Sequence, residues 1–287
     1  MYGVAELDRK LYVACRNSNH LLVFWVNHPQ YQNLPDIILN HLKRGPNDIA
    51  ACSLNRCLYI ADWSSDKRCI WRFDVASGRQ ERLADVAHCP VALSVTGDGR
   101  VLVTTRTNGI LVYQPTSTDD RPVPVVHVPD TVDARRAEYQ HAVELPETFV
   151  PSSLFVDGTR LFVALVTGWW ASFDDDNDAG FLVNCVHHRY AYTVLRPRGS
   201  FRMTRPHHLA LDENGSRVFV ADTDGNRVLV LDGRSDPVSS LRQIPGIGAP
   251  FRLWYIADMN LLIVGTILGF VYAVDVQTSS RECSTSM

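Results

Sequence analysis

The stretch PHHLALDENGSRVFVADTDGNRVLVL, residues 206–231, shows the unit from which this chain of 287 residues is built. Two short apolar runs, 208–212 and 218–222, flank a turn at 213–215, and Asp224-Gly225 separates the second run from a third at 228–231. β-Branched and aromatic residues fill the runs, while Asp, Asn and Gly fill the turns, which is typical of antiparallel strands joined tightly. With a further run at 240–244, the stretch predicts four antiparallel strands.

The same unit recurs along the whole chain. Five copies begin with a proline that leads into an apolar run: Pro46-Asn47-Asp48-Ile49, Pro90-Val91-Ala92-Leu93, Pro151-Ser152-Ser153-Leu154, Pro206-His207-His208-Leu209 and Pro250-Phe251-Arg252-Leu253. A sixth copy without the proline begins at Tyr2-Gly3-Val4, and second apolar runs start at Leu11, Leu58, Val101, Leu161, Val218 and Leu262. Strand-and-turn repeats at this spacing predict an all-β, six-bladed β-propeller of four-stranded antiparallel blades.

A propeller of this kind forms a single domain over 1–287, because one blade cannot bury its faces without neighbours. The predicted blades are approximately 1–44, 45–86, 87–129, 147–195, 203–245 and 248–287, with an insertion at 130–146 in which 133–143 is expected to form a short helix. The residues after 276 are mostly polar and do not indicate an outer strand, so the sixth blade is expected to be incomplete.

Composition excludes little about function. The net charge of −3 provides no global attraction for nucleic acid, and no apolar stretch is long enough to predict a transmembrane helix. No leader is apparent, the abrupt first repeat is typical of a fragment of a longer protein, and the compartment is left open.

Among seven cysteines, Cys52 and Cys57 flank a four-residue hairpin loop that places them opposite one another, as a disulfide or, by preference, as two thiols. Cys69 is expected beside Asp62.

The wording Ala221-Asp222-Thr223-Asp224-Gly225-Asn226-Arg227-Val228 resembles the NHL repeat, whose blades carry an Asp followed by Asn-Arg-Val at this spacing. Asn19-His20-Leu21 in the first repeat and Ala61-Asp62 in the second keep parts of the motif. The resemblance implies a six-bladed NHL-type propeller of the TolB-like and gluconolactonase-like superfamily.

Inner strands of a propeller start at one face, and the turns between second and third strands return to that face. The residue after each proline is therefore expected to surround the mouth of a central channel: Asn47, Val91, Ser152, His207 and Phe251, with Gly3 in the sixth place. Trp63, Trp169 and Trp170 fall in turns of the same face, where tryptophan favours partner contact or packs under its own loop.

Two resemblances suggest metal enzymes. Pro206-His207 is similar to a zinc-ligand motif of the peptidylglycine amidating lyase domain, but the matching positions in the other repeats supply no second histidine. Gluconolactonase-like propellers hold a divalent cation with Glu, Asn and Asp, whereas Glu6 has no matching Asn and Asp here. Asp174, Asp176 and Asp178 alternate as in half of a calcium loop but lack its glycine and its final Glu, which favours a solvated acidic loop.

A third resemblance concerns RNA. NHL propellers of tripartite-motif proteins bind single-stranded RNA on a basic face, and Arg196, Arg198, Arg202 and Arg205 cluster before the fifth repeat. The neighbouring aspartates and the negative net charge oppose phosphate binding.

The sequence therefore favours a monomeric binding propeller over an enzyme. We expect it to present one loop face to a protein, peptide or small ligand, without cofactor and without insertion into a membrane. Predicted contacts are Asn47, Ser152, His207, Phe251, Trp63, Trp169, Trp170 and Arg202. The alternatives are a zinc- or calcium-dependent lactonase or lyase, with His207, Asp174, Asp176 and Asp178 as candidate ligands, and an RNA-binding propeller.

Overall fold

The structure is a computed structural model. It describes residues 3–15, 18–27, 30–42, 46–63, 68–86, 89–97, 99–105, 110–114, 123–126, 149–157, 160–167, 181–186, 191–195, 206–212, 216–232, 239–277 and 281–282. Within these ranges the regular elements are all strands, and none of the residues is helical. Consequently the described part of the chain contains no helix that could cross a membrane.

The first three sheets are each made of four consecutive antiparallel strands. The first sheet contains β1 (Gly3–Leu7), β2 (Lys10–Ala14), β3 (His20–Asn27) and β4 (Gln30–Ile38). The second contains β5 (Pro46–Cys52), β6 (Cys57–Asp62), β7 (Cys69–Asp74) and β8 (Gln80–Asp85). The third contains β9 (Pro90–Val95), β10 (Val101–Thr105), β11 (Ile110–Gln114) and β12 (Val123–Val126).

The next three sheets repeat this order. The fourth contains β13 (Phe149–Asp157), β14 (Arg160–Thr167), β15 (Phe181–Val186) and β16 (Ala191–Leu195). The fifth contains β17 (Pro206–Leu211), β18 (Arg217–Asp222), β19 (Arg227–Asp232) and β20 (Ser239–Pro245). The sixth contains β21 (Pro250–Ile256), β22 (Leu261–Thr266), β23 (Val271–Asp275) and β24 (Arg281–Glu282).

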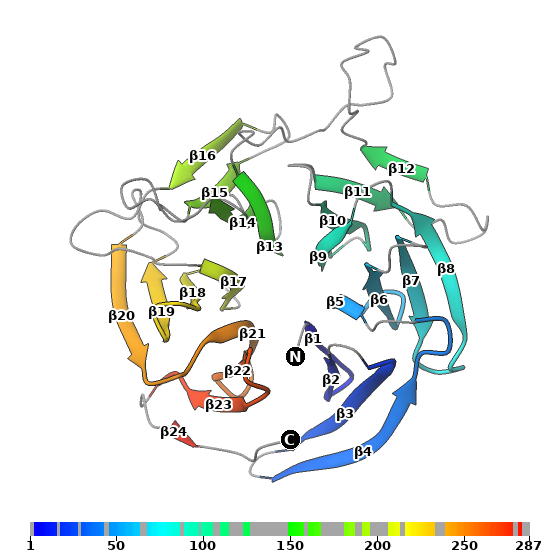
Figure 1. The fold of residues 1–287 in the computed structure, drawn as a ribbon, viewed down its shortest axis with the longest axis horizontal. Coiled ribbons are helices and arrows are strands. Elements are labelled where there is room, and N and C mark those ends of the chain that lie inside the picture. The colour runs from blue at the N-terminus through cyan, green and yellow to red at the C-terminus, as the bar shows by residue number, and fades with distance from the viewer. Residues whose placement is uncertain are drawn as a thin grey trace.

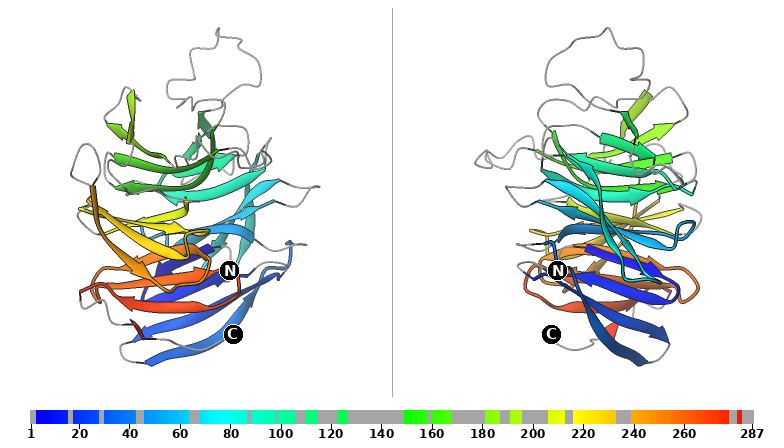
Figure 2. Two further views of the ribbon diagram at one scale, coloured as in Figure 1. Left: turned by 60° about the vertical axis from the view of Figure 1, so that its left-hand side comes forward. Right: turned by 90° about the vertical axis from the view of Figure 1, so that its right-hand side faces the viewer.

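The sheets surround a common centre as in a propeller, with the first strand of each sheet innermost and the fourth at the rim (Figure 1). Seen from the side, they form a disc whose strands run between two faces (Figure 2). Every second run that the sequence indicated is the second strand of a sheet, so the strand-and-turn repeat is confirmed as an all-β propeller arrangement.

Apolar side chains between neighbouring sheets make the core. β6 shows why: as the second of four strands it is flanked on both edges and covered on both sides, and all six of its residues are buried. Separate buried clusters lie between the first and second sheets, the second and third, and the fifth and sixth. Burying both faces of a sheet requires neighbours on each side, which favours a ring.

The first and sixth sheets close this arrangement. Val4, Leu11 and Val13 of the first sheet share a buried cluster with Ile256 and Ile263 of the sixth. Each sheet contains consecutive strands only, so within the described residues the first and sixth sheets meet by packing and not through a shared strand. The outer strand that the sequence did not indicate is β24, a two-residue strand paired with β23.

Two local predictions are confirmed by the register. Cys52 pairs with Cys57 across the β5–β6 hairpin, and no disulfide joins the two in the structure. Cys69 pairs with Asp62 in the next hairpin. The expected insertion at 130–146, with its helix, lies outside the described residues.

Candidate functional site

The strand register defines two faces of the disc. In all six sheets the first residue of the inner strand pairs with the last residue of the second strand, as Pro46 does with Asp62, Pro206 with Asp222, and Pro250 with Thr266. The inner-strand starts and the turns between second and third strands therefore share one face, here named the upper face. The opposite side, which carries the turns between first and second strands, is the lower face.

A β-bulge at the upper face changes the geometry that the sequence suggested. The register skips the residue after each proline, so Asn47, Val91, Ser152, His207 and Phe251 are each the extra residue of a bulge. Such a bulge re-aims the side chain that it inserts. A bulge cannot be read from apolar periodicity, because the strands on either side keep the same pattern.

The predicted position of Gly3 in the first sheet is corrected by the strand register. Gly3 pairs with Ala14 as Asp48 pairs with Ala61, so Gly3 is equivalent to Asp48 and not to Asn47. Its place in the predicted ring was wrong because the first repeat lacks the proline that marks the register. A Cβ atom on Gly3 would lie 2.5 Å from the amide nitrogen of Ile49 and 2.7 Å from Oδ1 of Asp48. The first two inner strands thus approach one another too closely for a side chain.

Three of the predicted ring residues connect neighbouring sheets. The Asn47 side-chain amide donates to the carbonyl oxygens of Pro90 and Val91, at 2.9 and 3.1 Å. The His207 and Phe251 rings pack tilted with centroids 4.0 Å apart, and both side chains are buried. These residues therefore hold the centre of the disc together. The side chain of Ser152 lies outside the described part.

The next position along the inner strand carries a polar side chain in the second, fifth and sixth sheets: Asp48, His208 and Arg252. Oδ2 of Asp48 accepts a hydrogen bond from the Leu93 amide at 2.9 Å, and Nδ1 of His208 accepts one from the Leu253 amide at 3.3 Å. In both cases the side chain bonds to the inner strand of the following sheet. Arg252 extends further, because its guanidinium donates to the Asn47 carbonyl of the second sheet at 3.2 Å.

These six residues, Asn47, Asp48, His207, His208, Phe251 and Arg252, form what we name the central cluster. Burial raises the pKa of Asp48 to about 6, although Arg252 and the amides of Leu93 and Ile49 lower it. Burial, assisted by Arg252 and His207, holds the pKa of His208 well below its usual value. His208 is therefore neutral at pH 7, which agrees with its Nδ1 atom accepting a hydrogen bond.

Other predicted site residues are only partly placed. Trp63 follows β6 at the upper face and is half-buried. Trp169, Trp170, Arg202, Asp174, Asp176 and Asp178 lie outside the described residues, as do Arg196, Arg198 and Arg205. Among the residues that the structure places, no three His, Cys, Asp or Glu side chains gather as metal ligands, so His207 has no such set around it there.

The upper face also carries three exposed apolar side chains that sequence reasoning missed. Ile267, Leu268 and Phe270, the apolar tip, lie in the β22–β23 turn with 53, 68 and 41% of their surfaces exposed. The turn itself is well ordered by hydrogen bonds. Oγ1 of Thr266 accepts from the Phe270 amide at 3.0 Å, and Gly269 provides a φ of 89°. Apolar residues at turn positions were the available signal, hidden within a longer apolar stretch.

The residues of the NHL-like motif support this turn from the neighbouring sheet. The Arg227 guanidinium donates to fully buried Asp222 at 2.8 Å, and Oγ1 of Thr223 donates to the Pro250 carbonyl at 2.7 Å. Asn226, with a φ of 49°, accepts from the Ala249 amide at 2.8 Å. The Ala249 carbonyl in turn accepts from the amide of Ile267 at 3.1 Å. A continuous chain of contacts thus leads from the motif to the apolar tip.

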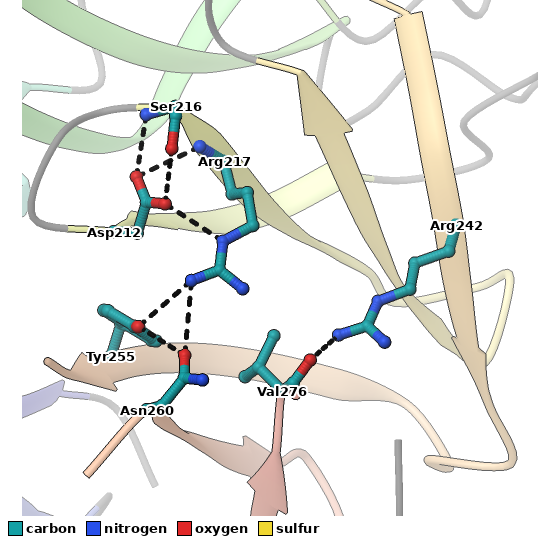
Figure 3. A network of polar contacts seen from close by, with 7 residues as sticks. All are labelled: Asp212, Ser216, Arg217, Arg242, Tyr255, Asn260 and Val276. Atoms are coloured by element: carbon teal, nitrogen blue, oxygen red, sulfur yellow. Dashed lines mark hydrogen bonds and ion pairs between the residues drawn. The ribbon is translucent and has the colours of Figure 1, made fainter. Parts of the chain in front are cut away.

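A second polar network fastens the same two sheets at the lower face (Figure 3). Arg217 donates to Asp212 at 3.0 Å and to Tyr255 and Asn260 at 3.2 Å each. The Tyr255 hydroxyl donates to Asn260 at 2.6 Å. The fifth and sixth sheets are therefore joined by side-chain hydrogen bonds at both faces.

Comparison with known proteins places the fold. No family model and no curated protein matches the chain. Among solved structures, a chain from a nidogen/laminin complex matches with a TM-score of 0.68 at 13% identity, covering 94% of this chain and 91% of that one. The chain is a β-propeller. Hydrazine synthase of Kuenenia stuttgartiensis matches this propeller with a TM-score of 0.65 at 13% identity, covering 95% and 82%. A protein from Lactobacillus plantarum matches with a TM-score of 0.62 at 14% identity, and the match covers 99% of this chain and 83% of that one.

Proposed function

We propose that the chain is a six-bladed, NHL-type propeller that binds a protein partner with its upper face, chiefly through the apolar tip. Trp63 lies on the same face, and Trp169, Trp170 and Arg202 are proposed as further contacts. The central cluster serves as the rigid hub of this scaffold. Its polar groups already bond across sheets, which supports a structural role for the centre and a binding role for the outer turns.

One observation carries the proposal: Ile267, Leu268 and Phe270 stay exposed on a turn that is held in place. Most large apolar side chains of the described part are buried, and adjacent exposed ones are characteristic of protein interfaces. A pre-ordered turn loses little conformational entropy on binding, which favours affinity. The similarity to a chain of the nidogen/laminin complex is compatible with such a role, since it shows the same fold within a protein assembly.

The test replaces apolar surface on one face at a time. Leu268→Asp should abolish capture of the proteins that the wild-type chain retains from a native extract, with an unchanged melting temperature. Leu54→Asp is the matched control, because Leu54 is a 67% exposed leucine in the β5–β6 turn of the lower face. Equal capture by both variants would refute the proposal. Loss of capture in the Leu54 variant alone would indicate that the interface lies on the lower face.

A further inference from the structure

Cys52 and Cys57 face each other at the lower end of the second sheet. They are the last pair of the β5–β6 ladder, on either side of a four-residue turn, with 2 and 0% of their surfaces exposed. Directly opposed residues of antiparallel strands have Cα atoms about 4.5 or 5.5 Å apart, depending on the pair type. Both spacings fall within the range of about 4.4–6.8 Å that disulfides span. The backbone therefore places the two sulfurs for a bond without rearrangement.

The surroundings distinguish the two thiols. The Asn55 amide donates to the sulfur of Cys52 at 3.4 Å, and Cys57 lies directly opposite Cys52 in the ladder. Interaction between the two thiols lowers the pKa of Cys52 and raises that of Cys57. Cys52 is therefore the thiol that loses its proton more readily, and the thiolate is the form that attacks a peroxide.

A cation lies next to the pair. Arg72 of β7 pairs with Tyr59, which is two residues from Cys57 on the same face of the sheet, and its guanidinium donates to Glu81 at 2.8 Å. Arg72 favours the charged form of the Cys57 sulfur, while Glu81 holds the guanidinium in position. Cys69 differs: it lies opposite Asp62 and Asp85, and burial followed by Asp62 raises its pKa to about 11 although Arg82 lowers it.

We propose that Cys52 and Cys57 form a redox-active dithiol that a hydroperoxide converts reversibly into a cross-strand disulfide. The Cys52 thiolate attacks one peroxide oxygen, which forms the S–O bond of a sulfenic acid, breaks the O–O bond and releases hydroxide. The sulfur of Cys57 then displaces the sulfenic hydroxyl, which leaves as water with the proton of Cys57. The hydroxide from the first step takes up the proton that Cys52 released when it became a thiolate. In total, two thiols and one hydrogen peroxide yield one disulfide and two waters.

Burial of the two sulfurs limits the oxidant to a small molecule. The sulfurs lie beneath a turn in which Ser53, Leu54 and Arg56 are exposed. The β9–β10 turn passes over this site, since a Cβ on Gly99 would lie 3.3 Å from Leu54 and Asn55 and 4.0 Å from the Cys52 sulfur. Hydrogen peroxide, the size of two water molecules, can reach such a site when the turn opens slightly. A bulky disulfide such as oxidised glutathione would have to displace the third sheet.

Trypsin provides a direct readout, because it cuts after Arg56, between the two cysteines. The expected peptides, 45–56 and 57–67, carry one cysteine each. After hydrogen peroxide, blocking of remaining thiols with N-ethylmaleimide and digestion without reductant, mass spectrometry should find these peptides joined, with a mass two hydrogens below their sum. Dithiothreitol should separate them. Oxidised glutathione at the same concentration should produce the linked pair much more slowly.

Three variants keep the test decisive. Cys57→Ser should abolish the linked pair and leave Cys52 as a sulfenic acid that dimedone traps, whereas Cys69→Ser should form the pair at the wild-type rate. Arg72→Gln should slow linkage while the circular dichroism spectrum is unchanged. If the folded wild-type protein retains both residues as thiols under peroxide, or oxidises Cys52 to a sulfinic acid without linkage, the proposal is wrong. Partner capture through the apolar tip is measured separately and does not depend on this result.

Discussion

Two interfaces between neighbouring sheets show how differently the same packing problem is solved within this propeller. Between the first and second sheets, Gly3 lies so close to Asp48 and Ile49 that a Cβ atom would overlap them. Between the fifth and sixth sheets, polar side chains bridge the sheets: Thr223 and Asn226 at the upper face, and Arg217 at the lower face. The first interface also has polar bridges, from Arg56 to Asp8 and from Gln80 to the Ile38 carbonyl, but its inner strands meet only because Gly3 has no side chain.

The difference matters because only the interface between the fifth and sixth sheets leads to the apolar tip. Asn226 bonds to Ala249, and Ala249 bonds to Ile267, so the NHL-like motif orients the turn that we propose as the binding surface. The glycine interface instead brings the inner strands near the central cluster together. We therefore expect changes in the first interface to alter stability, and changes in the second to alter stability and binding together.

The largest effect is expected for Asp222→Ala. Its carboxylate is fully buried and paired with Arg227, whose side chain is 23% exposed. Removing one partner of a buried pair leaves the other charge uncompensated, which lowers the free energy of unfolding by about 3 kcal/mol or more. Urea unfolding measures the change. The control, Asp258→Ala at an exposed position of the β21–β22 turn, should stay within about 0.5 kcal/mol of wild type.

The second prediction concerns the pH dependence of the glycine interface. Because burial raises the pKa of Asp48 to about 6, the folded protein binds a proton more tightly than the unfolded chain between pH 4 and 6. The stability that protonation provides is present below pH 4 and is lost as the pH rises towards 6. Asp48→Asn should remove this dependence while its amide oxygen can still accept from Leu93.

Measured by urea unfolding at several pH values, the stability of the wild type relative to Asp48→Asn should fall by up to about 1.4 kcal/mol per pH unit in this range. A constant difference between the two proteins would show that Asp48 is not protonated more readily in the folded state. Asp258→Asn serves as the control for the general effect of removing one carboxylate.

A third, smaller effect tests the close approach at Gly3. Gly3→Ala adds only the Cβ that would meet Ile49 and Asp48, so the two strands must separate. Overpacking of this kind lowers the free energy of unfolding by about 1–3 kcal/mol. Gly97→Ala is the matched control, since nothing lies within 4 Å of its Cβ position. Equal stability of the two variants would contradict the contrast between the interfaces.

The smallest effect on stability, and the most informative for function, is expected at Asn226. Asn226→Gly keeps the positive φ without strain but loses the hydrogen bond to Ala249. We expect the free energy of unfolding, measured by thermal unfolding, to fall by about 1 kcal/mol. Partner capture should weaken more than this small loss of stability would explain. Unaltered capture would mean that the motif does not orient the apolar tip.

Much of the fold could be predicted from the sequence, because strand and turn signals are local. The run of six buried residues in β6, the Asp224-Gly225 turn and the pairing of Cys52 with Cys57 all follow from residues near one another in the chain. The site was less predictable. Apolar periodicity does not reveal the bulges that bury His207 and Phe251, and the first repeat lacks the proline that would have aligned Gly3 with Asp48.

The order of apolar and turn residues by itself determined that this chain forms repeated four-stranded units, since each hydrogen-bonded hairpin is a short-range choice of the backbone. Only the tertiary structure decided that Arg252 of the sixth sheet reaches Asn47 of the second, and that Ile267, Leu268 and Phe270 remain exposed. Those outcomes depend on which sheets become neighbours around the centre. That arrangement depends on contacts between residues some 200 positions apart in the chain, and no local sequence pattern specifies it.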